Sequence, residues 1–195
     1  MPKAELTKAL IIEKTASVFN KKGFAGTSLT DIEEATGLTK GSIYSNFTSK
    51  DDVALAVFDY NLKTVNTIVN TEMSRYSSSR ERLMAYVKVY GKHVLDHPFP
   101  AGGCPILNTA IDADDTHPEL RKRASAAVIA WKDTVVGLIR KGIREGEFTG
   151  SIDPEETALT MVATIEGAVM ISKVTGKIAF LKTVMKSVEN MINDL

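Results

Sequence analysis

The sequence predicts an all-α protein, with a three-helix helix-turn-helix domain at the N-terminus and a helical bundle at the C-terminus. Apolar residues recur at three- and four-residue spacing along most of the 195 residues, whereas the alternation typical of strands is scarce. Residues 28–31 and 49–52 both match a capping box, with an acidic side chain at the third helical position. Asp153 and Pro154 supply a cap and a first helical residue for a later helix.

The expected helices run from these starts to stops that glycine and proline mark. The stops fall at Gly23, Gly37, residues 96–103, residues 145–150 and Gly176. About nine helices result, covering residues 5–22, 28–36, 40–46, 50–75, 79–96, 104–114, 118–145, 154–174 and 177–194. Because short helices come first and long ones follow, we divide the chain into a domain of residues 1–48 and a domain of residues 49–195.

The composition is that of a soluble protein in a reducing compartment, with balanced charge and a single cysteine. Hydrophobic residues make up 44% of the chain, and 24 basic residues balance 24 acidic ones. This balance argues against a polybasic nucleic-acid coat but permits a local basic face. The N-terminus has no apolar signal core, no apolar run approaches about 18 residues, and a single cysteine cannot form an intramolecular disulfide. We therefore expect a cytoplasmic location and no membrane partner.

Residues 28–46 have the pattern of a helix-turn-helix, in which two short helices meet at a steep angle across a three- or four-residue turn. Gly37 suits a left-handed C-cap, Leu38 can pack beneath both helices, and Thr39 can cap the second helix through its hydroxyl. The expected core joins apolar residues of the first three helices: Ile12, Ala16, Phe19, Ile32, Ala35, Ile43 and Phe47.

The second helix of this motif has an outward face that burial does not explain. The face carries small, polar or basic side chains, those of Lys40, Gly41, Ser42, Tyr44, Ser45 and Asn46. Such a face can enter the major groove of DNA, where serine and asparagine bond base edges. The residues placed to hold phosphates are Thr27, Ser28, Thr39, Tyr44 and Lys50. The alternative is a small helical subdomain without a nucleic-acid role.

A series of specific residues between positions 11 and 60 carries a family resemblance. In order, the series is Phe19, Gly23-Phe24, Thr27-Ser28, Asp31-Ile32, the turn from Ala35 to Gly37, Gly41, Ile43-Tyr44, Phe47 and Ser49-Lys50. With this series the segment resembles the DNA-binding part of the TetR family of bacterial transcriptional regulators. Two positions depart from the family pattern. Asn46 replaces a histidine or tyrosine, which leaves the operator sequence open, and Thr15 replaces an alanine in the first helix.

The resemblance implies a homodimeric repressor that a small molecule or an electrophile releases from a pseudo-palindromic operator on double-stranded DNA. In that family a connecting fourth helix leads into a bundle for ligand binding and dimerisation. Dimers form through the last two long helices, here 154–174 and 177–194. Effector binding moves the fourth helix, here about 50–75, and changes the separation of the recognition helices. A ligand-dependent activator or a co-repressed regulator of the same fold stays open.

Residues 96–124 combine a Gly-Cys-apolar stretch, an asparagine-containing helix and a Pro-x-Leu-Arg sequence. In this they resemble a subgroup of the same family. Pro105 at a first helical position makes Cys104 the cap, and a positive helix end makes a thiol more reactive. The resemblance implies that some relatives with such a cysteine respond to electrophiles or oxidants; the alternative is a buried, unreactive cysteine. The candidate effector-pocket residues are Tyr90, Phe99, Cys104, Asn108 and Trp131.

Metal and enzyme chemistry are not expected. His93 and His97 lie four residues apart with Cys104 beyond them, but Pro98 ends that helix and histidine is also favourable near a helix C-terminus. The sequence has no nucleophile elbow and no phosphate-cradling glycine loop. Pairing Cys104 with either histidine leaves no third group to orient the base. We therefore expect no metal site, no cofactor and no catalytic residue, with a thiol-based enzyme as the alternative.

Overall fold

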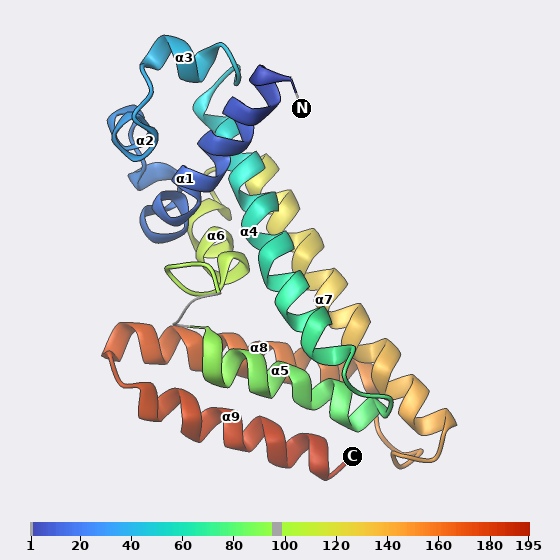
Figure 1. Cartoon of the computed structure of the whole chain (residues 1–195). Coiled ribbons are helices and arrows are strands. Elements are labelled where there is room, and N and C mark those ends of the chain that lie inside the picture. Colours follow the sequence, from blue (N-terminus) through green and yellow to red (C-terminus); the bar gives the residue numbers. More distant parts are fainter. Residues whose placement is uncertain (1, 95–98) are drawn as a thin grey trace. The chain divides into compact units, whose positions relative to one another are not determined.

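The computed structural model describes residues 2–94 and 99–195, and those residues form nine α-helices and no strand (Figure 1). The all-α class predicted from the sequence is confirmed, and every predicted helix end on a described residue lies within about four residues of the observed one, while the end predicted at residue 96 falls outside the described residues. The helices are α1 (Lys3–Gly26), α2 (Leu29–Thr36), α3 (Lys40–Tyr44), α4 (Lys50–Met73), α5 (Ser79–His93), α6 (Pro105–Ala113), α7 (Pro118–Arg144), α8 (Pro154–Thr175) and α9 (Ile178–Asn193).

The chain folds into two compact units, which do not divide at residue 48. One unit comprises Met1–Val65 with Pro100–Ser125, and the other comprises Asn66–Phe99 with Ala126–Leu195. Helices α4 and α7 contribute residues to both units, while α6 lies wholly in the first and packs on α1. Sequence patterns could not show this, because the contact joins segments far apart along the chain. The functional division into residues 1–48 and 49–195 stays a prediction.

Local rules start and stop the short helices of the first unit. Ser28 Oγ accepts a hydrogen bond from Asp31 N (3.1 Å), and Asp31 Oδ2 accepts one from Ser28 N (2.8 Å), which is the predicted capping box. Helix α2 ends at Gly37, whose φ of 69° is left-handed backbone that glycine adopts without steric cost. The Thr39 hydroxyl then accepts from Ser42 N (3.3 Å) and caps α3, as predicted.

The core between α1, α2 and α3 is apolar and closely follows the predicted set. The buried members are Ile11, Ala16, Phe19, Ile32, Ile43 and Phe47. Two predicted core residues, Ile12 and Ala35, are only half-buried. Ile11 is fully buried in place of its neighbour Ile12, while Ala16 and Phe19 on the same helix are buried as predicted. Thr15 is also buried, and its hydroxyl donates to Ile11 O (2.7 Å), which satisfies the polar atom inside the core.

Helix α1 is interrupted at the predicted stop. Gly23 has φ 72° and ψ 178°, a conformation outside the helical region, and a further short stretch of helix follows to Gly26. The prediction therefore found the break but missed the three residues beyond it. Thr27 is extended and leads directly into the cap of α2. The break thus sets the direction in which the chain enters the helix-turn-helix.

In the second unit α8 packs lengthwise against α9, and α5 packs against α9 (Figure 1). Asp153 caps α8 as predicted. The start of α5 is held by a side chain from beyond α7, since the Glu147 carboxylate accepts from Ser79 N (2.9 Å) and Arg80 N (3.1 Å). The hydrogen bond from Ser79 N is the main cause that lowers the pKa of Glu147 below its usual value.

Candidate nucleic-acid interface

The helix-turn-helix consists of α2, the turn Gly37–Thr39 and α3. A carboxylate joins the two helices, because Glu33 Oε1 on α2 accepts from Lys40 N (2.7 Å) at the start of α3. On the turn, Leu38 N donates to Thr36 Oγ1 (3.2 Å). These bonds satisfy backbone donors that a three-residue turn would otherwise leave open, so the angle between the helices is fixed by hydrogen bonds as well as by the core.

Helix α3 is five residues long and buries one of them, Ile43. Lys40 and Gly41 are exposed, while Ser42 and Tyr44 are half-buried. A Cβ placed on Gly41 would meet no other atom within 4 Å, so no packing contact requires glycine at this position. Gly41 is also helical rather than left-handed, so the backbone does not require it either. The missing side chain instead lets an external surface come close to the backbone of α3.

The residues after α3 differ from the prediction, which extended the helix to Asn46. The helix ends at Tyr44, and Ser45 is its C-cap. Ser45 Oγ donates to Ser42 O (2.8 Å), and Asn46 Nδ2 donates to the same oxygen (2.9 Å). Ser45 and Asn46, which were predicted to bond base edges, therefore each use one hydrogen-bond donor to bond the last turn of α3. Their acceptor atoms can still face a base, so base reading by Ser45 and Asn46 stays a prediction.

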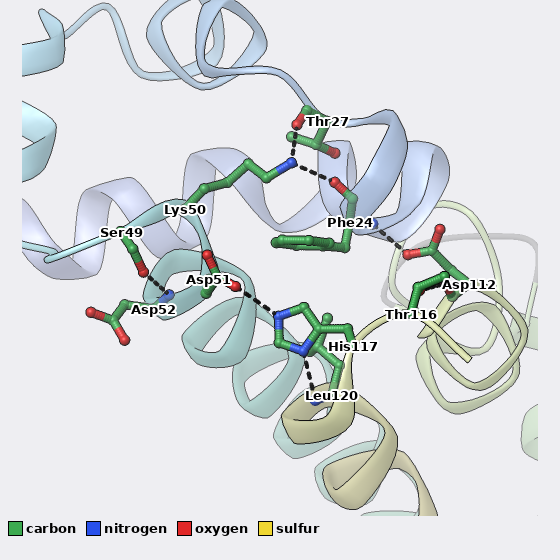
Figure 2. Close-up of polar contacts among 10 residues, drawn as sticks. All are labelled: Phe24, Thr27, Ser49, Lys50, Asp51, Asp52, Asp112, Thr116, His117 and Leu120. Carbon is green, nitrogen blue, oxygen red and sulfur yellow. Dashed lines mark hydrogen bonds and ion pairs between the residues drawn. The ribbon is translucent and has the colours of Figure 1, made fainter. Parts of the chain in front are cut away.

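Two of the five predicted phosphate contacts have hydrogen-bond partners within the protein, and their phosphate role stays a prediction. Thr27 is 1% exposed, and its hydroxyl donates to Gly23 O (2.6 Å), so it faces the interior. Lys50 Nζ donates to Phe24 O (2.8 Å) and Thr27 O (2.9 Å), and it lies 4.1 Å from the centroid of the Phe24 ring (Figure 2). Lys50 thus holds the end of α1, as a cation does at a helix C-terminus.

The other three phosphate candidates lie at the surface or close to it. Thr39 is exposed, and its hydroxyl, which accepts from Ser42 N, can also donate outward. Ser28 is exposed too, but its hydroxyl accepts from Asp31 N and donates its only proton to Asp31 Oδ2 (2.9 Å). This leaves it no donor for a phosphate. Tyr44 is half-buried. Thr39 and Tyr44 are therefore the better placed of the three.

The electrostatics of the interface include one ion pair that sequence reasoning missed. Lys22 Nζ near the end of α1 lies 2.6 Å from Asp31 Oδ1 on α2. The hydrogen bond from Lys22 lowers the pKa of Asp31 from 3.8 to about 2, with further help from Ser28 N. Asp31 therefore stays ionised and cancels one positive charge close to the expected DNA surface. No local signal could have found the pair, because Lys22 lies on the other side of the Gly23 break.

The predicted effector-pocket residues fall into both compact units. Tyr90, Phe99 and Trp131 meet in the second unit, where the ring centroids of Tyr90 lie 5.1 Å from Trp131 and 5.4 Å from Phe99. Tyr86, one turn before Tyr90, also stacks on Trp131 (5.5 Å) and was missed by the prediction. Its spacing of four from Tyr90 was the available signal, since such residues share a helix face. Burial raises the pKa of the Tyr86 phenol, which stays neutral.

Cys104 and Asn108 belong to the first unit. Cys104 is the N-cap of α6 with Pro105 at the first helical position, as predicted, and it is 0% exposed. Asn108 Nδ2 donates to Asn20 O (2.9 Å) and to Gly102 O (2.9 Å). The Asn108 side chain therefore links the loop before α6 to α1. Whether Cys104 and Asn108 line an effector site stays a prediction.

The histidine pair considered for a metal falls outside the described part of the chain, which includes neither the side chain of His93 nor residue 97. Among the side chains that the structure does describe, no group of three or more histidine, cysteine, aspartate or glutamate residues could hold a metal ion.

Two family models match this chain. The model for bacterial regulatory proteins of the tetR family matches residues 11–57, which contain the helix-turn-helix. The model for the tetracyclin repressor-like C-terminal domain matches residues 79–188. This chain belongs to the tetR family. The resemblance expected from residues 11–60 is thereby confirmed, and TetR-family proteins of this kind are DNA-binding transcriptional regulators.

Individual relatives agree with the TetR-family assignment. A TetR-family regulator from Cytophaga hutchinsonii is 45% identical, with a TM-score of 0.95 over 100% of this chain and 97% of that one. The transcriptional regulator TtgR of Pseudomonas putida is 28% identical over 173 residues, which span 85% of this chain and 80% of TtgR. A cysteine mutant of CifR, solved with 26-base-pair double-strand operator DNA, shares the fold at 20% identity (TM-score 0.83, covering 93% of this chain and 94% of CifR).

Proposed function

We propose that this TetR-family regulator is a cytoplasmic homodimeric repressor, which binds a pseudo-palindromic operator and releases it when an effector binds. The observation that carries the proposal is the outward face of α3, where Gly41 has no internal reason to be glycine and Lys40 is exposed. A short helix with small, polar and basic residues fits the major groove. The operator complex of CifR, which has the same fold, supports a double-stranded DNA partner.

Within α3 the contacts divide between phosphates and bases. Thr39, Lys40 and Tyr44 would hold phosphates. Thr39 and Lys40 stand at the start of α3, where a hydroxyl or ammonium joins the positive end of the helix dipole, and Tyr44 offers a hydroxyl from the last residue of the helix. Ser42 would face the bases together with Ser45 and Asn46, because the hydrogen bonds described for Ser42 use only its backbone atoms. Phosphate contacts set affinity and base contacts set sequence preference.

The composition of α8 supports a homodimer. Its most apolar 18-residue window has a mean hydropathy of 1.3, yet only 39% of that window is buried. By length and composition α8 could also cross a membrane, but it packs along α9 and buries seven residues, as a helix of a folded core does. Leu159, Met170 and Val174 stay exposed on one side of it. A second protomer, related by two-fold symmetry, would present the same exposed apolar residues, and pairing would bury both sets.

The same side of α8 permits close approach of such a partner. Ala163 and Gly167 lie between the exposed apolar residues at helical spacing, and a Cβ on Gly167 would meet open space. On α9 the exposed residues Ile178 and Phe180 add apolar area next to the end of α8. These positions fall in the predicted dimer segments, 154–174 and 177–194.

An effector site is best supported in the second unit, at the cluster of Tyr86, Tyr90, Phe99 and Trp131. This cluster is apolar, and the indole nitrogen of Trp131 is buried without a hydrogen-bond partner among the described residues. Release of DNA then requires two conformations with different affinities for effector and operator. Helices α4 and α7 run through both units, so they are the continuous elements through which a change could pass.

Fluorescence anisotropy tests the DNA-binding proposal with labelled duplexes from the region upstream of the gene, at several fixed salt concentrations. The expected result is a preference of at least about a thousandfold over a random duplex of the same length. Gly41→Leu should abolish the preference while circular dichroism shows an unchanged helix content. Equal affinity for both duplexes at every salt concentration would refute the proposal.

Addition of N-ethylmaleimide to the bound complex tests the cysteine as a switch, with Cys104→Ser as the control variant. Release of DNA by the wild type alone would identify a thiol-controlled repressor. Retention of DNA by both proteins would leave the repressor intact and direct the search to neutral aromatic ligands for the Trp131 cluster. In vitro transcription with the same template distinguishes repression from ligand-dependent activation.

A further inference from the structure

The segment Gly23–Thr27 connects α1 to the helix-turn-helix, and its backbone departs from a regular helix. The Gly23 break removes the usual i→i−4 partner from the amide that follows it, and a donor without a partner is costly when it is shielded from water. The Phe24 amide instead donates to Asp112 Oδ2 on α6, at 2.6 Å (Figure 2). A bond to a carboxylate at this length belongs to the strong, charge-assisted class.

Phe24 is held on its other sides as well. Its carbonyl accepts from Lys50 Nζ (2.8 Å) at the start of α4. Its ring packs edge-to-face on the imidazole of His117, with 4.5 Å between centroids. Residue 24 therefore touches side chains from α4, from α6 and from the turn before α7, all within the first compact unit. These three partners come from segments that are far apart along the chain.

The imidazole of His117 is itself fixed in position. Its Nδ1 accepts from Leu120 N (3.2 Å) and so caps α7, which leaves the proton on Nε2. Nε2 then donates to Asp51 Oδ1 on α4 (3.1 Å). His117 is 8% exposed, so neither bond competes freely with water. The ring that meets Phe24 is thus locked between α4 and α7.

Helix α6 is attached to α1 by a second set of bonds one turn before the break. Asn20 is 6% exposed, and its Nδ2 donates to Gly103 O (2.9 Å), while Asn108 Nδ2 donates back to Asn20 O (2.9 Å). The approach is close: a Cβ on Gly23 would lie 2.5 Å from Asp112 Oδ1. Helix α6 is therefore hydrogen-bonded to α1 on both sides of the break, through Asn108 to Asn20 before it and through Asp112 to Phe24 after it.

We infer that Asp112 is a positioning residue for DNA binding: its carboxylate holds the Phe24 amide, and with it the direction in which the chain enters α2. His117 contacts the ring of Phe24, whose backbone amide Asp112 holds. The inference rests on the proposed DNA-binding function and adds a route of control, because the position of α6 sets the orientation of α2 and α3 independently of Lys50 on α4.

Removal of the Asp112 carboxylate separates positioning from simple charge. Loss of a negative charge in a DNA-binding unit raises affinity through reduced phosphate repulsion. Asp112→Ala is expected to do the opposite and to lower operator affinity by about tenfold, since the bond that it removes is charge-assisted. The dependence of affinity on salt concentration should keep its slope, because every phosphate contact stays in place. The preferred operator sequence should also stay the same.

Two variants control for this result. Asp115→Ala removes a charge three residues away from an exposed side chain and should change affinity by less than about twofold. Asp112→Asn keeps a carbonyl oxygen that can accept from Phe24 N and should recover most of the affinity. A purely electrostatic role would instead make Asp112→Ala, Asp112→Asn and Asp115→Ala alike.

Amide hydrogen exchange measures the joint directly. Exchange at Phe24 should accelerate at least about tenfold in Asp112→Ala, while the core amides of Ile32 and Ile43 keep their protection. If Asp112→Ala does not fold, the same two measurements on Asp112→Asn decide, with smaller changes expected in the same direction.

The outcomes separate this inference from the proposed function. Faster Phe24 exchange with operator affinity within about twofold of wild type would overturn the positioning role alone. Unchanged Phe24 exchange would overturn it too. Failure of the wild-type protein to prefer any operator would overturn the proposed function and this inference with it.

Discussion

Helices α3 and α8 both have a composition that packing within the chain does not explain, but in opposite ways. Helix α3 is five residues long, polar, and buries only Ile43. Helix α8 is 22 residues long and apolar, yet less than half of its most apolar window is buried. A hydrated, negatively charged surface suits the first helix and a second apolar helix suits the other. The comparison shows that residues unexplained by the fold indicate the chemistry of the absent partner.

The largest effect is expected on the α8 side. Met170→Asp places a charge in the exposed apolar stripe, and burial of an unpaired carboxylate should weaken dimerisation by about 3 kcal/mol or more, which is over a hundredfold. Sedimentation velocity over a range of concentrations measures this change. Asn70→Asp adds the same charge to an exposed site on α4 and should leave dimers intact. A monomeric wild type would remove the basis of the comparison.

Lysines 40 and 50 sharpen the α3 side, because both are basic but only one faces outward. Lys40→Ala should reduce the slope of log affinity against log salt by about 0.9 for each phosphate that the lysine neutralises. Lys50→Ala should leave the slope unchanged, while the free energy of unfolding falls by about 1–2 kcal/mol because the bonds to Phe24 O and Thr27 O are removed. Equal slopes for the two variants would mean that Lys50 reaches phosphate after all.

Glycines 41 and 137 form a matched pair of moderate effect. Both lie in helices, and a Cβ on either meets no atom within 4 Å. Alanine at either position should therefore raise the free energy of unfolding by about 0.5–1 kcal/mol. Only Gly41→Ala should also weaken operator binding, by about tenfold, because its new methyl group enters the DNA surface. Thermal unfolding measures the change in stability of both variants, and fluorescence anisotropy on the same samples measures operator binding.

The smallest effect concerns the Lys22–Asp31 pair. The pKa of Asp31 in the folded protein, about 2, lies below its ordinary 3.8. The folded state therefore binds this proton more weakly than the unfolded state does, and the stability from the pair is present above about pH 4 and is lost as the pH falls toward 2. Asp31→Asn should flatten the dependence of Tm on pH in that window only. A difference from wild type that persists unchanged down to pH 2 would contradict the assignment.

Local rules account for what the sequence predicted well. The cap at Ser28, the left-handed Gly37 and the cap at Thr39 depend on neighbours within a few residues, so their geometry could be inferred from spacing alone. The family resemblance rested on the same segment. The burial of single residues was less secure, since Ile11 is buried where Ile12 was predicted.

Long-range contacts account for what the sequence did not predict. Thr27 and Lys50 were assigned to phosphates because both are polar and lie beside the helix-turn-helix, yet both bond backbone carbonyls of the segment from Gly23 to Thr27. Asp112 and His117 gave no signal at all, since their roles depend on residues 24 and 51. A polar residue near a binding motif can serve either the ligand or the scaffold, and only the fold distinguishes them.

The packing of α6 on α1 has a consequence for the design of hybrid regulators. A graft of residues 1–48 onto a foreign bundle would carry the recognition helix but leave behind the groups that hold its entrance. The Phe24 amide and the side chain of Asn20 would then be without their partners. A transplantable DNA-reading module of this protein is discontinuous in sequence and has to include residues 100–125.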